Sequence, residues 1–257
     1  MIAPAASVAY RLRTFGKLRF RVDAAGRWIN EQPDVTVVSP TIHTTSFRAF
    51  EQWVLDNWCF GYMPQRGDTV IDVGAGVGEE AIVFSKLVGS AGRVVSIEAH
   101  PRTFSCLSET VARSKLTNVV PVWAAITDDD AEAQIADSQD HLTNSIITGP
   151  RTLAVPAKSL DSLCDDLGIG SVALLKMNIE GAERLAVRGM DRLAERLKHV
   201  VISCHDFISD RDGNDEFRTF EDVRAKLESL GFEIRTRSND ERSWVRYYAY
   251  GRNRSLS

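Results

Sequence analysis

From about residue 69 onward, short apolar runs alternate with segments in which apolar residues recur every three or four positions. The runs are typical of buried strands, and the periodic segments are typical of helices that cover a sheet. The expected strands are 70–73, 94–98, 119–126, 172–179, 200–204, 232–237 and 244–251, and the later expected helices are 101–115, 182–197 and 219–230. Residues 238–240 form a turn between the last two strands, so the final strand should be antiparallel. The pattern predicts an α/β fold whose seven-stranded, mostly parallel sheet has helices on both faces.

The first part of the chain has a different pattern. Between residues 8 and 45, short β-prone runs such as 35–38 are separated by Gly26 and Pro33. Helical spacing of apolar residues then begins and continues over 46–58. We therefore expect a short N-terminal β-rich appendage, residues 1–45, and a main domain, residues 46–257. Residues 127–152 have weak periodicity and are expected to form loops, with room for a short hairpin.

Composition narrows the range of partners. The chain has 257 residues, of which 44% are hydrophobic, and this is enough for a sizeable core. Its net charge of −4 gives no electrostatic case for a nucleic-acid or membrane partner. Neither a secretory signal nor a run of about 20 apolar residues is visible, and Cys59, Cys106, Cys164 and Cys204 form no C-x-x-C pair. We expect a cytoplasmic protein with reduced thiols, which could form a homo-oligomer.

A glycine-rich turn follows the first strand of the main domain. Gly74, Gly76 and Gly78 alternate with other residues, which allows a tight turn whose bare backbone can approach a ligand. A dinucleotide fingerprint, G-x-G-x-x-G, needs a glycine where this chain has Glu79. The spacing G-x-G-x-G, with Asp72 just before it, instead suits S-adenosylmethionine, which has no pyrophosphate to anchor. An NAD-linked oxidoreductase is therefore the least expected alternative.

An acidic residue ends the second strand of the main domain. Glu98 lies about two dozen residues after Gly74, where a carboxylate can accept hydrogen bonds from both ribose hydroxyls of a nucleoside cofactor. The alternative is that Glu98 only caps its strand or the helix that begins near Pro101. With S-adenosylmethionine as the cofactor, the expected binding residues are Asp72, Gly74, Gly76, Gly78, Glu98, Ala99, Ala125 and Asn178.

Polar residues follow two further strands of the predicted sheet. Lys176, Asn178 and Glu180 alternate and so share one face, while His205 and Asp206 follow the next strand. The expected catalytic residues are His205, Asn178 and Glu180. His205, oriented by Asp206, is the expected general base because imidazole titrates near neutral pH; the alternative is a histidine satisfied by a backbone carbonyl. Lys176 is expected to neutralise a neighbouring acid rather than contact a ligand.

The same cluster could instead bind a divalent cation. Asn178, Glu180, His205 and Asp206 offer mixed ligands of the kind that suit Mg²⁺, which would lower the pKa of an acceptor hydroxyl. At position 178 an uncharged amide replaces a carboxylate, which weakens this alternative. We therefore expect activity without a metal, and Mg²⁺ is not favoured.

Residues 176–183, KMNIEGAE, resemble the Lys-x-Asp-x-Glu-Gly-x-Glu pattern of the FkbM-type S-adenosylmethionine-dependent methyltransferase family. Residues 160–163, residues 70–74 and the segment Glu98-x-His100-Pro101 also match, and the resemblance runs from about residue 50 to residue 206. Asn178 departs from the family's usual aspartate: it keeps an acceptor oxygen but is a poor general base. Seven strands with the last reversed also match the class I methyltransferase (Rossmann-like) layout.

The resemblance implies a function, because members of this family commonly methylate hydroxyls of sugars and natural products. We expect a methyltransferase that uses S-adenosylmethionine to O-methylate a small metabolite, with a sugar or a glycosylated natural product as the acceptor. An N- or carboxyl-methyltransferase is the first alternative. A non-catalytic cofactor-binding module is the second, and only Asn178 favours it. The expected partner is a small hydroxylated substrate, with no nucleic acid and no membrane.

Overall fold

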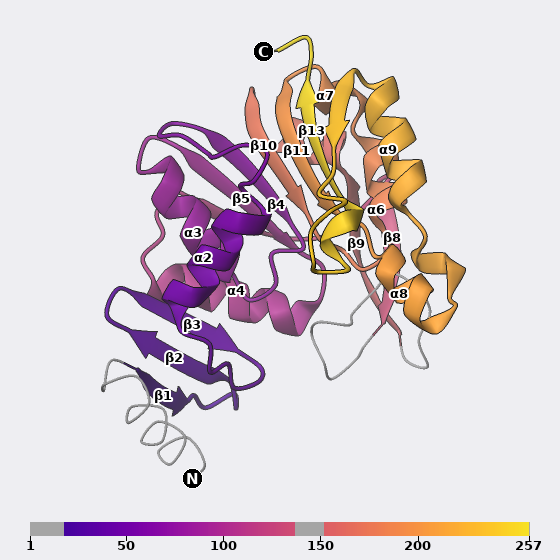
Figure 1. The fold of residues 1–257 in the computed structure, drawn as a ribbon. Helices are drawn as coiled ribbons and strands as arrows, with labels where there is room; N and C mark the ends of the chain where they lie inside the picture. The colour runs from indigo at the N-terminus through magenta and orange to yellow at the C-terminus, as the bar shows by residue number, and fades with distance from the viewer. Residues whose placement is uncertain (1–17, 137–151, 257) are drawn as a thin grey trace.

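The computed structural model describes residues 18–136 and 152–256. At its centre is a seven-stranded sheet with the strand order β12-β13-β11-β10-β4-β5-β6 (Figure 1). The strands are β4 (Thr69–Val73), β5 (Arg93–Glu98), β6 (Val119–Trp123), β10 (Val172–Met177), β11 (Leu197–Ser203), β12 (Phe232–Arg235) and β13 (Tyr248–Asn253). The strands run in one direction except β13, which pairs antiparallel with β11 on one side and β12 on the other. The predicted class I methyltransferase sheet, with its last strand reversed, is confirmed.

Helices cover both faces of this sheet, which explains why its strands have continuous apolar runs. Neighbouring residues of a strand point to opposite faces, so Val70 and Ile71 pack in two different core layers. One layer contains α2 (Phe47–Asn57), α3 (Glu79–Val88) and α4 (Pro101–Arg113), and the other contains α5 (Leu160–Asp166), α6 (Glu183–Ala186), α7 (Asp191–Ala194) and α9 (Phe220–Ser229). A ligand therefore reaches the central strands at their ends.

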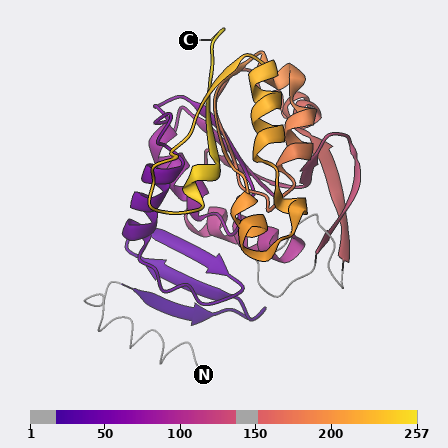
Figure 2. The same ribbon diagram turned by 45° about the vertical axis from the view of Figure 1, so that its right-hand side comes forward.

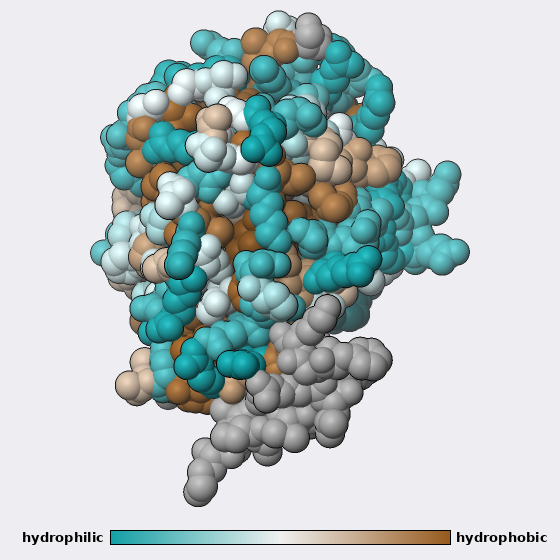
Figure 3. All heavy atoms as spheres, turned by 90° about the vertical axis from the view of Figure 1, so that its left-hand side faces the viewer, coloured by the Kyte–Doolittle hydropathy of each residue, from teal (hydrophilic) through white to brown (hydrophobic). Residues whose placement is uncertain are grey.

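The expected N-terminal strands form a small sheet of their own. β1 (Arg19–Val22), β2 (Trp28–Gln32) and β3 (Val35–Ser39) pair antiparallel, and Figure 2 shows this sheet beside the main body. It is attached along α4, where the backbone N–H of Val38 donates to Thr110 Oγ1 at 2.9 Å. Figure 3 shows the side of the molecule that carries these elements, with hydrophobic residues lying between hydrophilic ones. Residues 1–17 of the expected appendage lie outside the described residues.

The expected strand 119–126 is wrong, because two strands of different sheets replace it. After β6 the chain leaves the central sheet, and β7 (Ala125–Thr127) joins a three-stranded sheet of order β7-β9-β8. Its other members are β8 (Ala131–Ala136) and β9 (Thr152–Ser159), so the expected loop 127–152 contains a strand. Both parts of the run are apolar, so periodicity alone does not mark the break. Residues 137–151 lie outside the described residues.

Two other expected elements differ from the structure, and one helix was not expected. The expected helix 182–197 is broken into α6, a 3₁₀ turn and α7, and its last residue begins β11. Gly189 lies at the break, where a Cβ would be 2.7 Å from the carbonyl oxygen of Thr127. The last strand begins at Tyr248, later than expected, and the polar helix α8 (Asp206–Asp212) was not expected at all.

The four cysteines are free and buried, in agreement with the expected reduced thiols. Burial raises the pKa of the Cys59 thiol to about 12, which leaves little reactive thiolate at neutral pH. Within residues 18–136 and 152–256, no helix is both long enough and apolar enough to cross a membrane.

Candidate functional site

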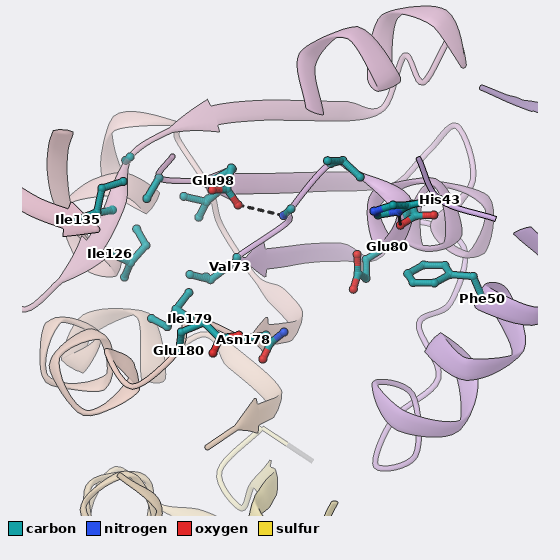
Figure 4. A pocket seen from close by; sticks show the side chains of 18 of the residues that line it. His43, Phe50, Val73, Glu80, Glu98, Ile126, Ile135, Asn178, Ile179 and Glu180 are labelled. Atoms are coloured by element: carbon teal, nitrogen blue, oxygen red, sulfur yellow. Dashed lines mark hydrogen bonds and ion pairs between the residues drawn. The ribbon is translucent and has the colours of Figure 1, made fainter. Parts of the chain in front are cut away.

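A cavity of about 530 Å³ lies at the carboxyl ends of β4, β5 and β10. Figure 4 shows Ile126 and Ile135 at one end of it and His43, Phe50 and Glu80 at the other. The predicted site residues that line it are Gly74, Gly76, Glu98, Ala99, Ala125, Asn178 and Glu180. The predicted site residues that are not in its lining are Asp72, Gly78, His205 and Asp206.

The three glycines of the turn have different roles. Gly74 (φ +73°) lies against the loop after β10, and a Cβ there would be 2.0 Å from the carbonyl oxygen of Asn178. Gly76 (φ +55°) has no heavy atom within 4 Å of its Cβ position, so bare backbone faces the cavity. Gly78 (φ +93°) is the N-cap of α3, and a Cβ there would be 2.8 Å from Leu107 Cδ1. Its expected cofactor contact is therefore replaced by a packing role.

The carboxylate of Glu98 is held at the cavity wall by two backbone groups. Its Oε2 accepts from the N–H of Gly76 at 3.0 Å, and its Oε1 accepts from the N–H of His100 at 2.8 Å (Figure 4). Burial raises the pKa of Glu98 to about 7, against the opposing effect of these two hydrogen bonds. His100 is the N-cap of α4, so Glu98 does contact the start of that helix and the capping alternative is partly right. Each carboxylate oxygen of Glu98 still has a second lone pair that can accept a hydrogen bond from a ligand.

A buried ion pair lies beneath the glycine turn. Lys176 Nζ is 2.8 Å from Asp72 Oδ1, and both side chains are fully buried. The same Nζ donates to the carbonyl oxygen of Gly74 at 2.9 Å, so it also supports the turn. Asp72 thus has a supporting role rather than the expected cofactor contact, while the neutralising role expected for Lys176 is confirmed.

A further acidic side chain, Glu80, lines the cavity. Burial raises the pKa of Glu80 to about 7; Lys176 opposes this shift, and the nearby carboxylates of Asp72 and Glu79 add to it. Glu79, Glu98 and Glu180 also line the cavity. Such a lining favours a positively charged ligand, which a sulfonium cofactor is.

The comparison with protein families decides the classification. A family model described as the methyltransferase FkbM domain matches residues 72–234, which is more than half of the chain. The chain belongs to the FkbM methyltransferase family. The resemblance read from residues 176–183 is thereby confirmed, and the chain has the family and fold of S-adenosylmethionine-dependent methyltransferases.

Solved structures and one curated protein extend this comparison. The FkbM methyltransferase from Methylobacillus flagellatus KT has a TM-score of 0.50 and 17% identity, over 72% of this chain and 43% of that chain. A SAM-dependent methyltransferase from Aquifex aeolicus has a TM-score of 0.45 and 16% identity, over 81% of this chain and 97% of that chain. The catalytic subunit TRM61 of the tRNA (adenine(58)-N(1))-methyltransferase from Yarrowia lipolytica is 32% identical over 71 residues, 28% of this chain and 18% of that protein. The Methylobacillus and Yarrowia proteins are thus matched over less than half of their length.

The FkbM motif residues occupy three different environments. Lys176 is in the buried pair, Asn178 and Glu180 line the cavity, and Glu183 is fully buried. The backbone N–H of Asn178 donates to the carbonyl oxygen of Val73 at 3.0 Å, which ties the loop to the end of β4. The strand β10 ends at Met177, so the strand alternation expected for residues 176–180 stops there, and Asn178 and Glu180 belong to the loop that follows.

His205 does not have the environment of a general base. It is 3% exposed, and its Nδ1 is 2.7 Å from Glu183 Oε1. Burial lowers the pKa of His205, but Glu183 and Glu180 outweigh this and raise it to about 10. An imidazole that carries its proton at neutral pH does not accept another. The structure therefore argues against the base expected from sequence.

Two of the four residues of the metal alternative, His205 and Asp206, have partners outside that set. Both ring nitrogens of His205 face carboxylates, and Asp206 Oδ2 accepts from the N–H groups of Thr219 and Phe220 at the start of α9. In the part of the chain that the structure describes, no group of three or more His, Cys, Asp or Glu side chains could hold a metal ion. Asp206 therefore orients a helix, not the imidazole.

Sequence reasoning missed one wall of the cavity. Phe50 and Trp53 stack with ring centroids 5.8 Å apart, and both line the cavity. Their helical spacing indicated packing against the sheet, and nothing in the spacing marks which packing residues also meet a ligand. His43, from the expected appendage, also reaches the cavity, where its Nδ1 is 3.5 Å from Glu79 Oε2.

Proposed function

We propose that this chain transfers the methyl group of S-adenosylmethionine to a hydroxyl of a small metabolite, with a sugar or a glycosylated natural product as the acceptor. The observation that carries the proposal is the fixed carboxylate of Glu98, at the wall of a cavity that also has bare glycine backbone. Family membership supports methyl transfer. The hydroxyl acceptor rests on the chemistry of the lining.

The residues present fit the cofactor. The apolar end, with Ile126 and Ile135, suits an adenine ring, and Glu98 beside it suits two ribose hydroxyls. At Gly76 a ligand can approach the backbone without meeting a side chain. When bound, S-adenosylmethionine supplies an electrophilic methyl carbon whose bond to sulfur breaks as the bond to the acceptor oxygen forms, leaving S-adenosylhomocysteine. The chain contributes alignment of the methyl donor and the acceptor.

The lining favours an acceptor without negative charge. Among the described residues that line the cavity there is no lysine or arginine, whereas Glu79, Glu80 and Glu180 are present. Phosphorylated and carboxylated acceptors would meet repulsion there, which argues against carboxyl methylation. The stacked rings of Phe50 and Trp53 offer a flat apolar surface that suits the face of a sugar or an aromatic aglycone.

Methylation of an amine is the second candidate, because the same carboxylates would also attract a cation. A direct test compares acceptors that differ only in the reacting group. We would incubate the protein with labelled S-adenosylmethionine and a panel of p-nitrophenyl glycosides, their amino-sugar counterparts and their uronic acids, and identify methylated products by mass spectrometry. Transfer to hydroxyls of the neutral glycosides is the expected result.

The controls separate the remaining alternatives. Glu98→Ala should reduce transfer to every acceptor, since it weakens cofactor binding and leaves the acceptor side unchanged. Transfer to amino groups alone would replace the hydroxyl proposal by the second candidate. Tight cofactor binding without methylation of any panel member or cell extract would indicate a non-catalytic module.

A further inference from the structure

Glu180 has a backbone conformation that its residue type rarely adopts. Its φ is +52°, and Lys115 is the only other described non-glycine residue with a positive φ. Glu180 lines the cavity, and its side chain is 24% exposed, so a small ligand can touch it. Backbone strain of this kind persists only where surrounding contacts fix it, and it is concentrated at sites of function.

A chain of polar contacts leads from Glu180 into the protein. His205 Nε2 is 3.4 Å from Glu180 Oε1, and its Nδ1 is 2.7 Å from Glu183 Oε1. Glu183 is held in turn by the hydroxyl of Thr219, which donates to Oε2 at 3.0 Å, and by the N–H of Gly181 at 3.2 Å. The contacts join the loop after β10, the end of β11 and the start of α9.

We propose that Glu180 is the catalytic carboxylate that accepts the proton of the acceptor hydroxyl, and that His205 is a positioning residue that holds it through an ion pair. This inference rests on the proposed function. In the balanced step, the hydroxyl oxygen gains the methyl group, its O–H bond breaks, and the proton passes to the carboxylate of Glu180 and then to solvent. The positive sulfonium becomes a neutral thioether, so charge is conserved.

The geometry explains why the histidine is not the proton acceptor. Its two ring nitrogens both face carboxylates, so neither is left for a substrate. Among the described side chains, Glu180 is the member of this contact chain that also lines the cavity. His205 therefore acts on the acceptor only by fixing Glu180.

The closing experiment is a double-mutant cycle on turnover, with Glu180→Gln, His205→Gln and the double variant. The acceptor is the p-nitrophenyl glycoside that the wild-type protein methylates fastest, and S-adenosylmethionine affinity is measured beside each rate. Glu180→Gln should lose about 10²–10⁴ in kcat with the cofactor Kd changed by less than about twofold. His205→Gln should lose about 10–10² in kcat, and the double variant should be no slower than Glu180→Gln alone.

A purely structural histidine would behave differently. Its substitution would lower the rate of the double variant further, by the same factor as in the wild-type background, and this result would overturn the positioning role. Wild-type turnover in Glu180→Gln would overturn the carboxylate's role while leaving the proposed function intact. A wild-type protein that methylates no hydroxyl contradicts the proposed function, and this inference falls with it. His205→Gln leaves the buried Glu183 without its charged partner. If His205→Gln does not fold, the variant His205→Gln/Glu183→Gln, which removes both charges, takes its place in the cycle.

Discussion

Replacing Lys176 by methionine should destabilise the protein strongly. The change removes the cation that pairs with Asp72, 2.8 Å away and fully buried, and it also removes the hydrogen bond to Gly74. Breaking a buried pair from one side typically costs about 3–5 kcal/mol, because the other charge is left without compensation. With a urea m-value of about 2–3 kcal/mol/M, a loss of about 4 kcal/mol lowers the unfolding midpoint by about 1–2 M.

Urea unfolding followed by tryptophan fluorescence measures this change, since the Trp58 ring lies 5.2 Å from Lys176 Nζ. The matched control is Asp72→Asn/Lys176→Met, which removes both charges and should recover at least half of the lost stability. Two results would refute the reasoning: a Lys176→Met variant within about 1 kcal/mol of wild type, or a double variant that loses the sum of the two single changes.

Two further predictions concern the glycine turn and pH. Gly76→Val and Gly78→Val each place a β-branched residue at a positive φ, so both should lose stability in urea. Gly78→Val should lose more, because its Cβ also meets Leu107, and Gly76→Val should abolish cofactor binding in calorimetry; equal stability losses, or cofactor binding by Gly76→Val, would contradict their assigned roles. Because the pKa of His205 is raised to about 10, its stabilising contribution is complete below about pH 6.5 and is lost as pH rises toward 10. The stability advantage of wild type over His205→Gln should therefore shrink between pH 7 and pH 10, and a constant advantage in urea titrations would refute the charged imidazole.

The fold was predictable because its strongest signals are local. A strand buried on both faces has to be apolar throughout, as residues 70–73 are, and the spacing from Gly74 to Glu98 follows from one strand, one helix and a second strand. Where one sequence pattern is compatible with two different local structures, the prediction was wrong. The run 119–126 is apolar on both sides of its break, and the spacing around Gly189 does not reveal that another backbone passes beside it.

The candidate site was predictable only in part, because side-chain roles depend on distant partners. Gly76 and Gly78 look equivalent in the sequence, yet one faces a cavity and the other faces Leu107. His205 looked like a base because its residue type titrates near neutral pH. The carboxylate of Glu183, 22 residues away in the chain, changes its pKa, and no spacing rule reports that contact.

The central claim is that this cavity binds S-adenosylmethionine through Glu98, and one calorimetric titration tests it directly. Wild-type protein should bind S-adenosylmethionine and S-adenosylhomocysteine but not NAD(H). Glu98→Ala should lose about 1.5–3 kcal/mol, or about ten- to a hundredfold in affinity, while the surface control Glu109→Ala on α4 should keep wild-type affinity. Unchanged affinity in Glu98→Ala, or no binding by the wild-type protein, would contradict the account.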